Sequence, residues 1–142
     1  MLLIILTCLG LLVLTTLIHY EVLRGLSLAL PQVQIRPRAK LIVVIITAFL
    51  AHVVEIALYA LAIYCLVRFA GLGTLGDSAR FGFDVSLYFS AETYTSLGYG
   101  DVVPGGDLRL VAGAEALNGL LLIGWSASYA YIAMERFWNG EH

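Results

Sequence analysis

Thr95-Ser96-Leu97-Gly98-Tyr99-Gly100-Asp101 is the stretch of sequence that decides the fold. It lies between two apolar segments that are each long enough to cross a lipid bilayer. Glycine adopts positive φ without steric cost, so Gly98 and Gly100 allow successive carbonyl oxygens to turn toward one axis. Rings of such oxygens can replace the hydration shell of a dehydrated cation. The stretch therefore predicts a pore for cations.

The composition of the 142-residue chain indicates that lipid is its solvent. Hydrophobic residues make up 61% of the chain and charged residues only 13%, which is more apolar surface than a soluble domain of this length buries. The net charge of −2 gives no reason to expect nucleic acid as a partner.

Three apolar segments of about 20 residues or more predict an all-α membrane protein. We divide the chain into an N-terminal transmembrane helix (1–23), a basic cytoplasmic loop (24–40), a pore module (41–134) and a short cytoplasmic tail (135–142). The first segment has no positive n-region and no small-x-small cleavage site, so we interpret it as a retained helix and not as a signal peptide.

The pore module is predicted to contain a re-entrant helix. Its expected parts are an outer helix (41–69), an extracellular loop (70–83), a pore helix (84–95), a filter (96–101) and an inner helix (108–134). The pore helix, at 1.5 Å per residue, would be about 18 Å long, which is too short to span. It must enter the membrane and return, with Asp84 expected to cap its first turn.

Charge placement predicts the orientation of the chain. The loop between the first two spans has an excess of Lys and Arg, which favours the cytoplasmic side, and Pro31 and Pro37 are expected to break any helix there. The second loop is more acidic: it carries Asp77, Asp84, Asp101 and Asp107 against Arg80 and Arg109. We therefore expect the N-terminus outside and the C-terminus in the cytoplasm.

Residues 87–104, LYFSAETYTSLGYGDVVP, resemble the pore helix and filter of prokaryotic potassium channels. The resemblance extends over about 41–134 in architecture and is specific in residues only in the pore loop. It implies a potassium-selective channel of the two-transmembrane pore-loop family, with an extra N-terminal helix, in the bacterial inner membrane. It also implies a homotetramer around the filter, K⁺ as the permeant ion and no cofactor.

By this resemblance, K⁺ would bind the backbone carbonyl oxygens of Ser96, Leu97, Gly98 and Tyr99, and Gly100 would complete the filter. Ser96 and Leu97 stand where the commoner motif has Thr and Val. Serine keeps the hydroxyl ligand at the inner end but lacks the methyl group that limits its rotation, and leucine is not β-branched. We therefore expect potassium selectivity with a looser innermost site.

Residues beside the filter are expected to support it, among them Tyr94 and Thr95 at the end of the pore helix. Tyr88, Phe89 and Tyr94 could form an aromatic cuff around the filter or could act as interfacial anchors. In similar channels, carboxylates placed like Glu92 and Asp101 share a proton, since two neighbouring carboxylates do not both ionise. The alternative is that Glu92 faces a water-filled crevice alone.

The third span contains Gly119 and Gly124, at positions where pore-lining helices of this family often bend. Glycine lowers the cost of a kink and also lets neighbouring helices approach closely. We expect a hinge at Gly119 and close packing at Gly124.

Four polar residues are expected to form an intramembrane cluster behind the pore: His52, Glu55, Glu115 and Asn118. The second and third spans supply two of them each. The two residues of a pair are three positions apart, so they share one face of their helix. The cluster could be a proton-sensitive gate, because histidine titrates near neutral pH, or hydrogen-bonding glue between helices, which we favour. The first span is expected on the lipid-facing periphery, with an apolar surface all round.

Other classes of function stay open on the sequence. They are a weakly selective monovalent cation channel, a subunit of an active potassium transporter, and a non-conducting membrane scaffold or sensor. Enzymatic activity is not expected, because His52-x-x-Glu55 lacks a second histidine one turn away and a third ligand at the spacing of a metalloprotease site.

Overall fold

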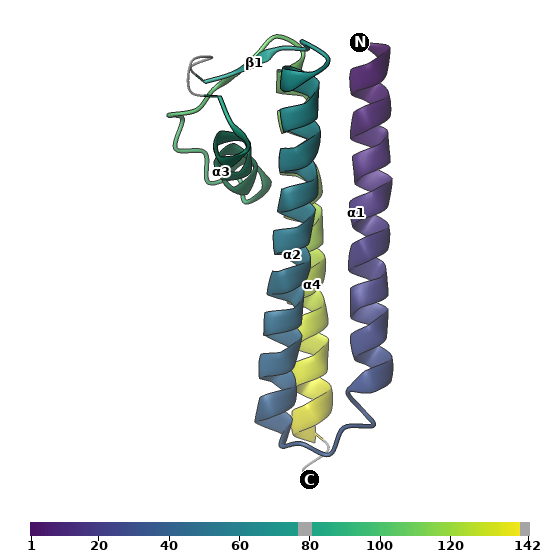
Figure 1. The fold of residues 1–142 in the computed structure, drawn as a ribbon. Coiled ribbons are helices and arrows are strands. Elements are labelled where there is room, and N and C mark those ends of the chain that lie inside the picture. The colour runs from purple at the N-terminus through teal and green to yellow at the C-terminus, as the bar shows by residue number, and fades with distance from the viewer. Residues whose placement is uncertain (77–80, 140–142) are drawn as a thin grey trace.

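The computed structural model describes residues 1–76 and 81–139, which contain four helices and two short strands. These are α1 (Leu2–Ala29), α2 (Pro37–Arg68), β1 (Thr74–Leu75), α3 (Phe83–Tyr94), β2 (Pro104–Gly105) and α4 (Leu108–Asn139). Figure 1 shows α1, α2 and α4 as three long helices along one axis, with α3 beside the end of the bundle that carries the N-terminus. The three long helices are apolar enough to cross a membrane, so the predicted all-α membrane fold is confirmed.

The long helices extend beyond the predicted spans. α1 continues to Ala29, past the expected end at residue 23, and α4 continues to Asn139 instead of ending at 134. α2 begins at Pro37, which lies in the first helical turn and does not break the helix. Proline suits this position because the first-turn N–H groups have no partner within the helix.

The pore helix α3 has 12 residues, and Gly82, not Asp84, occupies its N-cap position. The expected capping role of Asp84 is therefore wrong, although its charge in the first turn still favours the helix N-terminus. α3 packs against both α2 and α4. β1 and β2 pair antiparallel and connect the segments on either side of the pore loop, with Thr74 opposite Gly105 and Leu75 opposite Pro104. Asp77 and Arg80, which entered the charge argument, lie outside the described residues.

The sequence had led us to expect an apolar surface all round α1, and this expectation is wrong. One of its faces is buried against α2 and α4, and the buried residues recur every three to seven positions: Ile4, Leu11, Thr15, His19, Leu23 and Leu26. This spacing keeps them on one side of a helix. Thr15 and His19 bring polar atoms into the centre of the bundle, where neither side chain is exposed.

Candidate functional site

The backbone of the predicted filter has positive φ at every second residue. The φ values are +57° at Ser96, +56° at Gly98 and +82° at Gly100, whereas Leu97 and Tyr99 have negative φ. Such alternation turns successive N–H groups toward the same side of the chain. Within the described residues, Ser96 is the one non-glycine residue with positive φ, so its backbone is strained.

The N–H groups of the filter point toward α3. Those of Leu97 and Gly98 donate to the Glu92 carbonyl oxygen at 2.9 and 3.4 Å, and that of Tyr99 donates to Glu92 Oε1 at 3.2 Å. In a trans peptide the preceding carbonyl points opposite to the N–H, and no peptide in the described chain is cis. The carbonyl oxygens of Ser96, Leu97 and Gly98 therefore face away from α3.

The face that carries these oxygens is open in a single chain. All residues of the filter are exposed, with Leu97 at 59% and Tyr99 at 71%. The neighbouring surface of α4 is similarly open, because Leu117, Leu120 and Leu121 are each about 60% exposed. One chain thus leaves both the filter oxygens and these apolar side chains uncovered.

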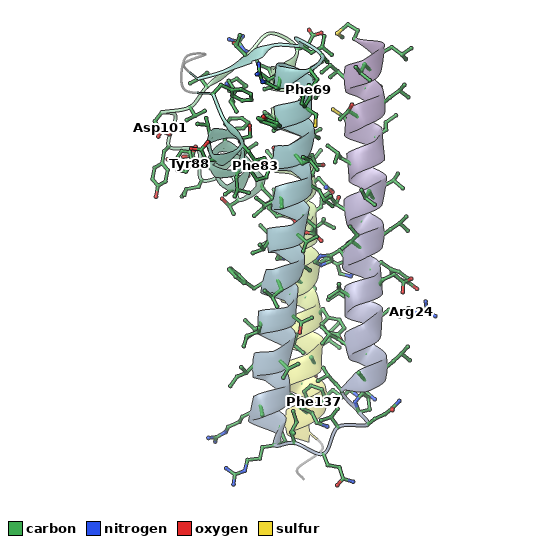
Figure 2. All side chains as sticks on the ribbon, viewed as in Figure 1. Arg24, Phe69, Phe83, Tyr88, Asp101 and Phe137 are labelled. Atoms are coloured by element: carbon green, nitrogen blue, oxygen red, sulfur yellow. The ribbon has the colours of Figure 1, made fainter. Side chains whose placement is uncertain are left out.

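Glu92 and Asp101 have separate hydrogen-bond partners. Across residues 1–76 and 81–139, no hydrogen bond joins the two carboxylates, so the expected sharing of a proton is not seen. Glu92 accepts from the filter backbone, and Asp101 accepts from the Tyr88 hydroxyl at 3.1 Å. Figure 2 shows Tyr88 and Asp101 on the side of α3 away from α2.

The Tyr88 hydroxyl remains a hydrogen-bond donor over the whole physiological pH range. Desolvation raises its pKa to about 12, and the hydrogen bond to Asp101 and the charge of the nearby Glu92 carboxylate act in the same direction. The bond from Tyr88 to Asp101 therefore ties the outer end of the filter to α3 in place of a proton shared between the carboxylates.

Tyr94 anchors the other end of α3 inside the helix bundle. Its side chain is fully buried, and its hydroxyl donates a short hydrogen bond to Glu55 and lies 2.9 Å from His52 Nδ1. It ties α3 to α2 and does not act as a cuff around the filter. The following residue, Thr95, bonds back through its hydroxyl to the Ala91 carbonyl oxygen at 2.7 Å and so caps the end of α3.

Close packing within the chain is found at Gly119 and not at Gly124, where we had expected it. A Cβ atom at Gly119 would overlap the Tyr94 carbonyl oxygen, so close packing against the end of α3 requires glycine there. A Cβ atom at Gly124 would meet nothing within 4 Å in the described chain. The packing role belongs to Gly119, and Gly124 has no such constraint within one chain.

The predicted four-residue cluster is divided into two groups. In the first, the Glu55 carboxylate binds two histidines: Oε1 lies 2.9 Å from His19 Nδ1, and Oε2 lies 3.0 Å from His52 Nδ1. Ser126 Oγ closes the ring, at 3.1 Å from His19 Nε2 and 3.0 Å from His52 Nε2. We call these four residues and Tyr94 the histidine cluster; it joins α1, α2, α3 and α4.

The second group contains the other two predicted residues. Asn118 Nδ2 donates to Thr15 Oγ1 at 2.7 Å and to the Tyr59 hydroxyl at 3.0 Å. Glu115 accepts a short hydrogen bond from the Ser90 hydroxyl, and its second oxygen has no partner in the described part of the chain. The Asn118 contacts join α1 to α2 and α4, and the Glu115 contact joins α3 to α4. Both are hydrogen bonds between helices, as in the interpretation that we favour. The proton-sensitive gate stays a prediction.

Sequence reasoning missed Thr15, Ser90, Ser126 and, above all, His19. His19 comes only four residues before the predicted end of the first span at residue 23, so its position along the chain does not suggest a buried role. Thr15 and His19 are four residues apart on the face that also contains Leu11 and Leu23, and that spacing is the signal that could have found them.

A family model described as "Ion channel" matches residues 40–136, which is more than half of the chain. The chain belongs to this ion channel family. Comparisons with curated proteins and with solved structures found no match. The matched region contains nearly all of α2, the whole pore loop and most of α4, and α1 precedes it. Together with its three apolar helices, this makes the protein an integral membrane ion channel.

In this channel, α1 is attached to the family's pore region through polar side chains as well as apolar ones. His19 and Thr15 come from the segment before the match, and their partners Glu55, Ser126 and Asn118 lie within it. The N-terminal helix is therefore an integrated part of the channel bundle.

Replacement of Asn118 with leucine should weaken the attachment of α1. It removes the hydrogen bonds to Thr15 and Tyr59 and should lower the free energy of unfolding by about 1 kcal/mol, as for other hydrogen bonds between membrane helices. A double-mutant cycle with Thr15→Val, measured by denaturation in detergent micelles, isolates the pair. Strictly additive effects of the two substitutions would show that the bond contributes nothing.

Proposed function

We propose that this channel conducts K⁺ passively through a filter built from the backbone carbonyl oxygens of Ser96, Leu97, Gly98 and Tyr99. The observation that supports the proposal is the anchoring of three successive N–H groups to Glu92, which directs the preceding carbonyls to the opposite, open side. Oxygens arranged in this way can replace the hydration shell of a cation. Gly100 and the bond from Tyr88 to Asp101 support the outer end.

The channel assembles as a homotetramer in this proposal. One chain supplies one strand of oxygens, and a closed ring requires symmetric copies around one axis. The exposed filter and the exposed leucines of α4 are the surfaces that would face that axis. α3 ends next to the filter, so the partial negative charge at its C-terminus favours a cation beside that end of the helix.

The proposed orientation follows the distribution of charge along the bundle. The α1–α2 connection and the C-terminal end lie together at the end away from α3 (Figure 1). Basic residues gather there, and Lys40 Nζ lies 5.3 Å from the centre of the Phe137 ring. Asp101 and Asp107 lie on the pore-loop side, where Asp107 is 3.6 Å from the N-terminal amine. We therefore place the α1–α2 connection in the cytoplasm, with the bacterial inner membrane as the setting.

The decisive experiment is electrophysiology of the purified full chain in planar bilayers with K⁺ on one side and Na⁺ on the other. A current that reverses far from zero, in the direction of the K⁺ gradient, supports the proposal. Reversal near zero would instead show a weakly selective cation channel, since Ser96 and Leu97 alter the inner filter. No current in potassium-loaded liposomes would favour a scaffold or sensor.

Replacement of Glu92 with alanine should reduce potassium selectivity. The Tyr99 N–H would lose its acceptor, and hydrogen bonds to charged groups contribute about 1.5–3 kcal/mol each. Glu92→Gln is the matched control, because its amide oxygen can still accept from Tyr99. The reversal potential measured under the same two-cation conditions should shift toward zero for Glu92→Ala and remain near the parent value for Glu92→Gln. Equal selectivity in both variants would rule out the anchoring role.

A further inference from the structure

We propose that His19, His52 and Glu55 form a binding site for a divalent transition-metal ion such as Zn²⁺ inside the helix bundle. One ligand atom from each residue lies within 4.8 Å of the other two. The site joins α1 to α2 and is separate from the filter. Along the chain His52-x-x-Glu55 lacks a third ligand at suitable spacing, because the second histidine, His19, comes from a different helix, 33 residues before His52.

The ligand atoms already stand close to the separations that a small metal ion needs. Bonds of about 2.0–2.1 Å in tetrahedral geometry place neighbouring ligand atoms about 3.3 Å apart. In the structure, His19 Nδ1 is 2.9 Å from Glu55 Oε1, and His52 Nδ1 is 3.0 Å from Glu55 Oε2. Each histidine nitrogen thus faces its own Glu55 oxygen, and the three side chains would have to shift so that both nitrogens and one oxygen surround the ion.

The chemistry of the donor set also fits a transition metal. Two imidazoles and one carboxylate suit Zn²⁺ and its neighbours, and the carboxylate offsets part of the ionic charge. The Tyr94 hydroxyl, 2.9 Å from His52 Nδ1, or a water molecule would complete the coordination. Hard cations such as Mg²⁺ are disfavoured, because they prefer a shell of oxygen ligands.

Ser126 orients both histidines for this role. A metal bound at both Nδ1 atoms leaves both Nε2 atoms carrying hydrogen, and each needs an acceptor. Ser126 Oγ lies 3.0 Å from His52 Nε2 and 3.1 Å from His19 Nε2, and its two lone pairs can accept both bonds. The cluster therefore includes the outer hydrogen bonds that hold histidine ligands in position.

An access route leads to one side of the site. A groove of about 250 Å³ between α2 and α4 is lined by His52 and Ser126, together with apolar residues such as Ala48 and Ile123. The His52 side chain is 16% exposed, while His19 and Glu55 are fully buried behind it. An ion that enters this groove meets His52 first.

Metal occupancy would act on the end of the pore helix. Tyr94 bonds Glu55 directly and is the last residue of α3, two positions before the filter. A metal bound to the Glu55 oxygens would weaken their hydrogen bond with Tyr94. The end of α3 next to the filter would then be held differently. This regulatory consequence rests on the proposed channel function, whereas the binding site itself does not.

The binding test uses untagged full-length protein in detergent, treated with chelator and then titrated with Co²⁺, whose visible absorption reports nitrogen and oxygen ligation. We expect one ion per chain, displaced by Zn²⁺. Ser126→Ala should weaken binding by about 10- to 100-fold, and His52→Gln should weaken it at least as much. His142→Ala is the matched control and should bind normally, although that residue lies outside the described part of the chain.

Several results would overturn the site. The first is a Co²⁺ spectrum that does not change when the protein is added. The second is loss of Co²⁺ binding in His142→Ala. The third is an unchanged Co²⁺ affinity in a His52→Gln protein that elutes like the parent protein on size exclusion. A current that responds to pH, in a protein that binds no Co²⁺, would assign the cluster to protons instead. Metal binding with no K⁺ current would leave the site standing and reject the proposed channel function.

Discussion

Replacement of Gly119 with alanine should abolish the potassium current that we propose for this channel. The new Cβ atom would overlap the Tyr94 carbonyl oxygen and lie 2.9 Å from its carbonyl carbon, and these are backbone atoms that cannot rotate away. Overpacking of this kind usually costs about 1–3 kcal/mol and more where the backbone must shift. Because Tyr94 is followed directly by Thr95 and the filter, displacement of α4 from α3 should move the carbonyl oxygens out of the proposed ring.

The measurement combines potassium flux from liposomes with the oligomeric state on size exclusion. Gly124→Ala on the same helix is the matched control and should retain flux, since its Cβ atom would meet nothing within 4 Å in the described chain. The hinge hypothesis makes a different prediction. If Gly119→Ala assembles with parental stability and changes only the open probability, the packing argument is wrong.

Replacement of Glu55 with leucine should destabilise the channel more than any other single change in the polar clusters. Glu55 is the common partner of His19, His52 and Tyr94, which come from three different helices. Removal of one member of a buried charged network typically costs about 3–5 kcal/mol, because the remaining groups are left without partners. We expect loss of the folded channel at ordinary temperature.

Thermal unfolding of the variants in chelator-containing buffer measures this effect without a contribution from bound metal. Glu55→Gln is the control, because it keeps the side-chain shape and one acceptor oxygen and should lose clearly less stability than Glu55→Leu. A stability of Glu55→Leu equal to that of the parent would mean that the three partners find water or other acceptors, and that the cluster does not hold the helices together.

The sequence alone determined the parts of this protein that depend on local chemistry. The lengths of the three apolar segments fixed the number of spans, since a bilayer has one thickness. The glycines at 98 and 100 predicted the positive φ values that turn the filter backbone, and both have them. The pore helix was expected at 84–95 and lies at Phe83–Tyr94.

Only the tertiary structure decided which side chains meet. α1 is apolar along nearly all its length, so its sequence does not reveal how it rotates about its axis, and that rotation places His19 beside Glu55. The same holds for Gly119, whose role depends on how closely α3 approaches α4. Spacing along one helix shows which residues share a face. The partner of that face is set by packing between helices, which brings together residues as distant as Thr15 and Asn118.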